Sequence, residues 1–235
     1  MTRAATAVRS FLRSAPGTCV WLLVLLCTTI ALHQMSPGSA RDFLGRRSTN
    51  IHELSVHPVR VLIQSAMWID SGHWLPYAVL YAVFHAEAER WLGTARWLAV
   101  AAGAHIVASF ISEGALLWAI RIGQAPQSAV NTLDVGVSYA LAGIVGVLTY
   151  RIAPPWRYGY LAVVLTLCTT PLIIGRTFTD LGHFISVLTG LAWYPVTRGR
   201  PVRNPRGALR AAWRYAPGNR RRDTERSGSS NQRLL

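Results

Sequence analysis

The sequence contains little charge and no lysine. Charged residues make up 14% of its 235 positions, whereas an average soluble protein carries roughly 25%. All 24 basic residues are Arg, eleven of them lie between Arg198 and Arg233, and 51% of all residues are hydrophobic. Such a composition excludes intrinsic disorder, coiled coils, collagen and an ordinary water-soluble enzyme. It indicates a membrane protein with several spanning segments.

Cysteine is also scarce. Cys19, Cys27 and Cys168 lie in apolar runs without CxxC spacing, so we expect packing roles and neither a disulfide framework nor a metal site. His52 and His57 have no metal-ligand spacing either, and no cofactor is predicted. The net charge of +14 does not indicate nucleic-acid binding, because the excess follows the last apolar segment. There it predicts a cytoplasmic anchor that contacts anionic lipid.

Six apolar windows of about 18–22 residues can each cross a hydrocarbon core of ~30 Å. They are approximately residues 15–32, 73–91, 96–117, 132–151, 156–175 and 178–197. We therefore predict an all-α integral membrane bundle of six helices over residues 15–197. Residues 1–14 form a cytoplasmic N-terminus, and the basic tail 198–235 is expected to be largely disordered apart from an amphipathic piece at 208–215. An apolar stretch at 59–69 is too short to cross, and we expect it to be interfacial or re-entrant within a long first outer loop.

The ends of the chain predict its topology. Both are basic and favour the cytoplasm, which requires an even number of crossings of the cell membrane. The first window has a second interpretation, because Arg3, Arg9 and Arg13 precede an apolar core of about 15 residues and residues 37–40 resemble a signal-peptidase site. We favour a retained helix, since the window reaches spanning length.

Polar residues recur at one depth in this arrangement. Helices two, four and six would all begin at the outer surface, and their first two turns contain His73, Asp134, Ser138, Asp180 and His183. Two stripes of small residues would let helices four and six approach closely; they are Ser138, Ala142 and Gly146, and Gly182, Ser186 and Gly190. Ser138 and His183 would then come within hydrogen-bonding reach, and serine activated by histidine is the minimal unit of nucleophilic acyl transfer. The competing interpretation is ordinary helix packing.

The order of elements resembles the rhomboid intramembrane serine proteases over roughly residues 15–197. Gly136-Val137-Ser138, followed by Ala142-Gly143 and Gly146, resembles the GxSG-bearing fourth helix of that family. The stretch from His183 to Gly190 is similar to the family's His-xx-Gly-xxx-Gly pattern, with Ser186 at the first glycine. Glu89 to Gly93 resembles the Glu-xx-Leu-Gly end of the second helix, and His73 matches the histidine at its outer start.

The resemblance implies a dyad in which Ser138 is the nucleophile and His183 the general base, and which cleaves transmembrane segments of other proteins. It also implies an oxyanion hole formed by the Ser138 backbone N–H and the His73 side chain, with Gly136 and Tyr77 beside it. The sequence departs from the family pattern where Tyr139 follows the serine, where Tyr77 replaces an asparagine and where a supporting tyrosine falls at Ala142. These departures keep open a catalytically silent rhomboid-like protein that binds transmembrane clients.

The remaining ionisable residues allow further hypotheses. Asp180 either orients His183, completing a triad, or caps helix six. Asp134 is expected to pair with a group such as His73, whereas His85 and His105 are expected to form interhelical hydrogen bonds. A small transporter with Asp134, Asp180 and the histidines as a proton relay is a third function, and the lack of an internal repeat or of broken helices counts against it.

Overall fold

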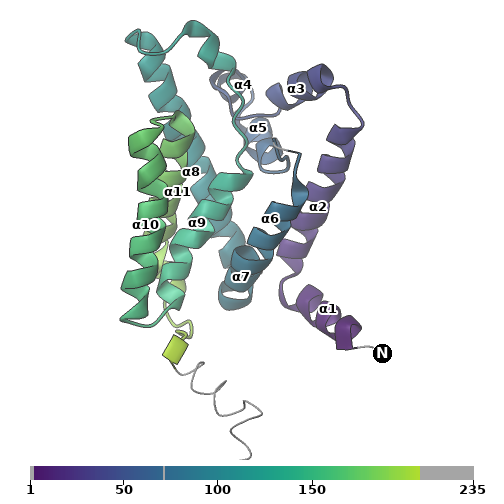
Figure 1. The fold of residues 1–235 in the computed structure, drawn as a ribbon, viewed down its shortest axis with the longest axis vertical. Helices are drawn as coiled ribbons and strands as arrows, with labels where there is room; N and C mark the ends of the chain where they lie inside the picture. The colour runs from purple at the N-terminus through teal and green to yellow at the C-terminus, as the bar shows by residue number, and fades with distance from the viewer. Residues whose placement is uncertain (1–2, 71, 207–235) are drawn as a thin grey trace, which may run out of the picture.

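The computed structural model of the chain describes residues 3–70 and 72–206, and over these residues the regular structure is helical. The one extended pairing among them is an isolated parallel bridge between Ile152 and Arg203. The helices run between two ends (Figure 1). The upper end in that view carries α3 (Pro37–Gly45), α4 (Ile51–Val56) and the connection from α8 to α9; the lower end carries α1 (Arg3–Ser14) and the segment that follows α11.

Each predicted window contains a helix or a continuous helical run. They are α2 (Pro16–His33), α6 (Trp74–Leu80) continued by the π-helix η1 (Tyr81–His85) and α7 (Ala86–Leu92), α8 (Thr94–Arg121), α9 (Val137–Leu148) with the 3-10 turn η3 (Thr149–Arg151), α10 (Trp156–Ile174) and α11 (Phe178–Ala192). Within the described residues, α2, α8 and α10 are each long and apolar enough to cross a membrane on their own. The short elements are α5 (Pro58–Ser65), η2 (Gln127–Asn131) and η4 (Tyr194–Thr197).

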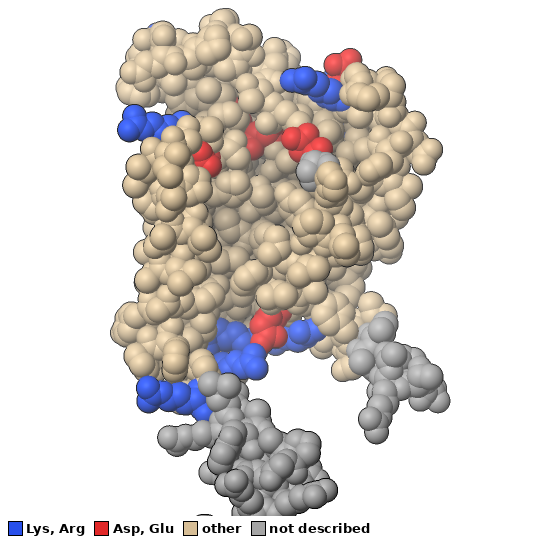
Figure 2. All heavy atoms as spheres, in the orientation of Figure 1, with Lys and Arg blue, Asp and Glu red and all other residues tan. Residues whose placement is uncertain are grey.

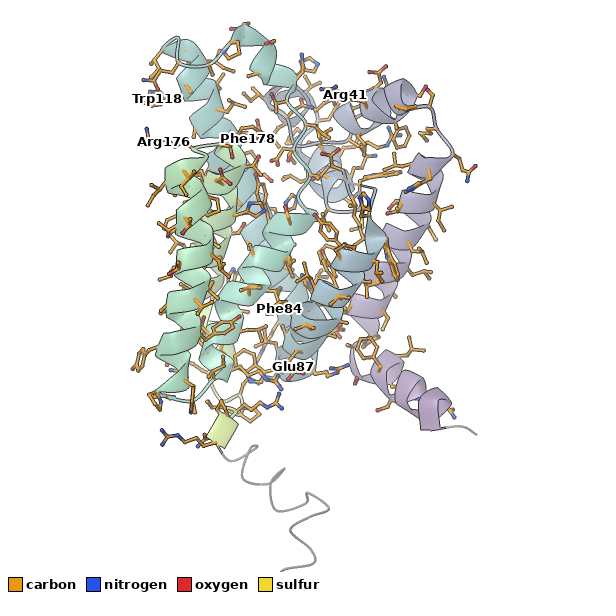
Figure 3. All side chains as sticks on the ribbon, viewed as in Figure 1. Arg41, Phe84, Glu87, Trp118, Arg176 and Phe178 are labelled. Carbon is orange, nitrogen blue, oxygen red and sulfur yellow. The ribbon has the colours of Figure 1, made fainter. Side chains whose placement is uncertain are left out.

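The distribution of charge agrees with a membrane protein. Figure 2 shows arginines and acidic residues gathered toward the two ends, with a band of uncharged residues between them. Figure 3 places Glu87 at the lower end and Arg41, Trp118, Arg176 and Phe178 at the upper end. In the middle of the bundle the outward-facing side chains of α10 are mostly apolar, and Val163 and Leu167 are exposed beside Thr166. Such a surface suits contact with lipid rather than water.

The start of α2 is capped by a residue from another helix. Ala15 offers no capping side chain, and the Glu89 carboxylate of α7 accepts hydrogen bonds from the Gly17 and Thr18 N–H groups at 2.8 and 2.7 Å. It also accepts from the hydroxyls of Thr18 and Thr94, each at 2.8 Å. A negative charge at a helix N-terminus accepts hydrogen bonds from the unpaired N–H groups of the first turn, and it interacts favourably with the helix dipole. These bonds tie the start of α2 to α7.

An aromatic cluster joins α2 to the centre of the bundle. The Trp21 ring meets the rings of Tyr81 and Trp97 edge-on, at centroid distances of 5.5 and 5.8 Å. Trp97 Nε1 donates to His85 Nδ1 at 3.1 Å, and the Tyr81 hydroxyl donates to the Val137 carbonyl at 3.3 Å. The expected interhelical role of His85 is therefore confirmed.

The connection between α2 and α6 packs into the bundle. Its helix α5 has eight residues, too few to cross a membrane, and Val61, Ser65 and Ile69 are fully buried. His105 of α8 bonds this segment through Nε2, which lies 2.9 Å from the Leu62 carbonyl and 3.3 Å from Ser65 Oγ. The interhelical hydrogen bond expected for His105 is thus confirmed.

Helices α9 and α11 form the closest helix pair. A Cβ atom on Gly190 would overlap the Gly143 carbonyl, and one on Gly146 would lie 2.5 Å from the Val187 carbonyl. The predicted α11 stripe of Gly182, Ser186 and Gly190 is buried as a whole. The prediction for α9 was correct at Gly146, whereas Tyr139 and Gly143 face the contact in place of Ser138 and Ala142, which are only partly buried.

The fourth predicted helix begins later than expected. Residues 132–135 are not helical, because the Thr49 N–H donates to the Asp134 carbonyl at 3.0 Å and the Gly136 N–H to the Ser65 carbonyl at 3.2 Å. These bonds hold the chain outside the helix until Val137. Asp134 therefore precedes α9, and Ser138 is its second residue instead of lying six residues into the helix.

The described end of the chain returns to the lower end of the bundle. The Trp91 Nε1 group donates to the Pro201 carbonyl at 2.8 Å, and the Arg203 guanidinium lies 3.3 Å from Glu87. The Arg90 guanidinium also donates to Ser14 Oγ at 2.9 Å, so the last residue of α1 lies beside α7 as well. Residues 207–235, including the piece expected at 208–215, lie outside the described residues.

Candidate functional site

The two predicted dyad residues lie near the upper ends of two adjacent helices. Ser138 is the second residue of α9 and His183 is the sixth of α11, and both are partly buried. Within the described chain, no hydrogen bond joins the Ser138 hydroxyl to the His183 ring. A serine nucleophile needs its base at about 2.6–3.2 Å, with looser geometry tolerated in a resting enzyme. The structure thus brings the two helices together without forming the dyad bond.

The side chain of Tyr139 lies between α9 and the His183 ring. Its ring meets the His183 ring edge-on at a centroid distance of 5.1 Å, and a Cβ atom on Gly182 would overlap it. Successive residues of an α-helix point about 100° apart. The Ser138 side chain therefore leaves α9 in a different direction from the side chain that contacts His183. The tyrosine that contacts the histidine in this chain is Tyr139, directly after Ser138.

Asp180 caps α11. Its carboxylate accepts from the Thr177 hydroxyl at 2.7 Å and from the Thr177 N–H at 3.2 Å, while Thr177 Oγ1 accepts from the Asp180 N–H at 3.1 Å. This reciprocal arrangement is a capping box. Of the two predicted roles for Asp180, the structure bears out the cap.

The residues expected near the oxyanion lie in different surroundings. His73 precedes α6 and is exposed, while Tyr77 packs against the hydrophobic core. Gly136 is buried directly against the His105 ring, which a Cβ atom would overlap. Close packing thus requires glycine at position 136 whether or not Ser138 is a nucleophile.

Asp134 has a partner that the sequence did not suggest. Its Oδ2 atom accepts from the Thr49 hydroxyl at 3.2 Å, and the pairing with His73 stays a prediction. Thr49 lies 85 residues earlier in the connection between α3 and α4. The bond joins two connections at the upper end, and a separation of this length leaves no local sequence signal.

A second acidic side chain, Glu113 of α8, lies close to Asp134. Both are 3% exposed, and they are near enough to interact electrostatically. The buried Tyr139 hydroxyl lies beside Ser112 and Asp134, but it makes no hydrogen bond of good geometry. We call Ser112, Glu113, Asp134 and Tyr139 the upper polar cluster. Sequence reasoning missed Glu113, although an acidic residue inside an apolar window is itself a signal of function.

The chemistry open to this region follows from its side chains. Carboxyl, hydroxyl and imidazole groups gather at the upper ends of α8, α9 and α11, where they can bind protons and cations or donate hydrogen bonds. Over the described residues, no group of three or more His, Cys, Asp or Glu side chains is arranged to hold a metal ion.

Comparison with known proteins gives one match. A family model described as "Rhomboid-like protein" matches residues 10–203, which include every helix from α2 to α11. No curated protein and no solved structure matches the chain.

Proposed function

Because the chain belongs to the rhomboid-like protein family, we propose that it binds transmembrane segments of other membrane proteins without cleaving them. The observation that carries this proposal is the packing of Tyr139. Its ring lies against the His183 ring at a centroid distance of 5.1 Å, and within the described chain no hydrogen bond joins the Ser138 hydroxyl to that ring. A serine hydroxyl without a hydrogen bond to a general base is not activated as a nucleophile for acyl transfer.

Packing in the same region supports a structural role for these residues. Tyr139 is fully buried, and a Cβ atom on Gly182 would overlap its ring. Moving this ring to admit Ser138 would disturb the α9–α11 contact, in which Gly143 and Gly190 approach backbone to backbone. Tightly packed interiors resist such changes.

Proteolysis by Ser138 and His183 is the second candidate. It is favoured by the position of both residues near the upper ends of two helices in direct contact. In this function Ser138 would attack a carbonyl of a membrane segment and His183 would accept its proton. The Ser138 backbone N–H and His73 would then stabilise the oxyanion.

The proposed topology has six crossings of the cell membrane with both ends in the cytoplasm, where the Arg-rich tail contacts anionic lipid. The charge of the tail and the location of Ser14 and Pro201 beside the same helix, α7, support it. A reporter fused after Leu235 should be active only in the cytoplasm, and activity on the outer side would contradict the proposal.

The test of function measures binding and cleavage together. The full chain is reconstituted in lipid vesicles with a fluorescent Leu-rich peptide of about 22 residues, long enough to span the bilayer. Energy transfer should report association, the peptide should remain intact, and Ser138→Ala should associate equally well. Cleavage that disappears in Ser138→Ala would establish the protease instead, and absence of association would overturn client binding.

A further inference from the structure

Glu113 is an unusual residue for the interior of a membrane helix. Its side chain is 3% exposed, and neither carboxylate oxygen has a hydrogen-bond partner. Native proteins almost always pair buried polar groups, and intramembrane acids usually pair with a basic group. A buried carboxyl group that its own chain leaves unpaired is suited to meet a group from outside.

Asp134 is the one charged group among the described residues that acts on Glu113. Asp134 and Tyr139 of the upper polar cluster interact with it electrostatically. Across the described residues, the ion pairs of Arg involve only Glu53 and Glu87. Two neighbouring acids of low exposure without a counter-charge favour any positive charge that reaches them.

A cavity reaches Glu113 from the outside of the bundle. It has a volume of about 220 Å³ and lies between α4 and α8. Its walls are mostly apolar, and the residues lining it are Ile51, Leu54, Ser55, Phe110, Glu113, Gly114 and Leu117. Phe110 is itself exposed on the outer surface of α8. Apolar walls with an acid among them match a side chain that has an aliphatic stem and a cationic end.

The height of the cavity in the membrane also suits such a side chain. Glu113 lies 19 residues after Thr94 in α8, which is about 28 Å along the helix. The hydrocarbon core is ~30 Å thick. With Thr94 at its lower boundary, Glu113 lies near its upper boundary. Lys and Arg of membrane segments are placed at that boundary, where their stems stay in the apolar region.

We propose that Glu113 and the cavity between α4 and α8 bind a Lys or Arg side chain at the outer boundary of a client's membrane segment. This inference rests on the proposed client binding and adds the chemistry of the client. The apolar walls take the aliphatic stem, the Glu113 carboxylate pairs with the cationic end, and Asp134 adds to the negative potential. Specificity arises because a segment without a basic residue leaves the carboxyl group unpaired.

The experiment compares three peptides on the same reconstituted full-length protein. Each is Leu-rich, spans the bilayer and is flanked by Trp, and one boundary position carries Lys, Leu or Glu. Energy transfer should show the Lys peptide binding about tenfold more tightly than the Leu peptide, and the Glu peptide no more tightly than Leu. The isosteric variant Glu113→Gln should remove the preference for Lys.

Glu53→Gln is the matched control, because Glu53 lies on α4 and pairs at the surface with Arg60 at 2.7 Å. It should keep the preference for Lys. Equal binding of the Lys and Leu peptides to the wild type would overturn the inference. This comparison uses only the wild-type protein and therefore does not depend on whether a variant folds. A preference that survives in Glu113→Gln would overturn the inference as well. If all three peptides bind equally, client binding stands and only this inference fails; if none binds, the proposed function fails with it.

Discussion

At the scale of single residues, the position of the Tyr139 ring decides between a protease and a catalytically inactive protein. The sequence places Ser138 and His183 in helices that do come together. It does not reveal that Tyr139 would lie against the histidine. The direction of a side chain depends on where its helix begins, and α9 begins at Val137. A serine that starts a helix and one that lies six residues inside it have different neighbours.

The residue with the clearest role in stability is Glu89. Its carboxylate accepts four hydrogen bonds, two from the first turn of α2 and two from threonine hydroxyls. Glu89→Gln keeps the shape but replaces one acceptor oxygen by a donor and removes the charge. We expect it to lower the free energy of unfolding by about 2–4 kcal/mol, because bonds to charged groups are strong and buried donors are left unpaired. Denaturant titration in detergent micelles measures this loss.

The control for that change is Glu53→Gln. Glu53 forms a surface pair with Arg60, whose side chain is 47% exposed, and exposed pairs contribute about 0–1 kcal/mol. A loss for Glu89→Gln no larger than for Glu53→Gln would show that the cap of α2 is not important for stability.

Some residue roles could be read from the sequence and others could not. The capping box is local, since Thr177 and Asp180 are three positions apart, and the cap was one of the two roles predicted for Asp180. The partner of Asp134 is distant, since Thr49 belongs to another connection. An acidic residue at position 113, inside an apolar window, could have been recognised from the sequence as a functional candidate. Only the structure shows that its carboxylate has no hydrogen-bond partner.

At the scale of helices, apolar windows located all six runs because spanning length and hydropathy are properties of the sequence. The predicted first and last residues of the helices were less accurate. Tertiary hydrogen bonds from the Thr49 and Gly136 N–H groups delay the start of α9, and no window contains such information. The small-residue stripe was correct for α11. On α9 it was correct at Gly146 but not at Ser138 and Ala142, whose neighbours Tyr139 and Gly143 face the contact.

The contact between α9 and α11 gives a prediction at this scale. Gly190→Ala should lower the free energy of unfolding by about 1–3 kcal/mol, because the added methyl group would overlap the Gly143 carbonyl and backbone cannot rotate away. Gly159→Ala in α10 is the matched control, since nothing lies within 4 Å of its Cβ position. Alanine is a better helix former than glycine, so this control should be neutral or slightly stabilising. Equal effects of the two changes on thermal unfolding would mean that the close approach is not required.

At the scale of the whole molecule, composition alone indicated a polytopic membrane protein, and the family match over residues 10–203 agrees. Function is the level at which the sequence was least decisive. A catalytic dyad forms only when its two side chains lie within hydrogen-bonding distance. Neither the charge nor the hydrophobic periodicity of the sequence determines that distance. The same helices suit a protease and a protein that only binds membrane segments, and the difference lies in what touches His183.

Labelling with a fluorophosphonate probe tests the central claim most directly, because the probe reacts only with a serine activated by a base. Vesicles containing the wild type, Ser138→Ala or His183→Ala are treated alike, and a soluble serine hydrolase added to each sample confirms that the probe is active. We predict that the wild type is labelled no more than Ser138→Ala, because the His183 ring packs against Tyr139 and makes no hydrogen bond to Ser138 among the described residues. Labelling of the wild type that is lost in both variants would contradict this and establish a working dyad.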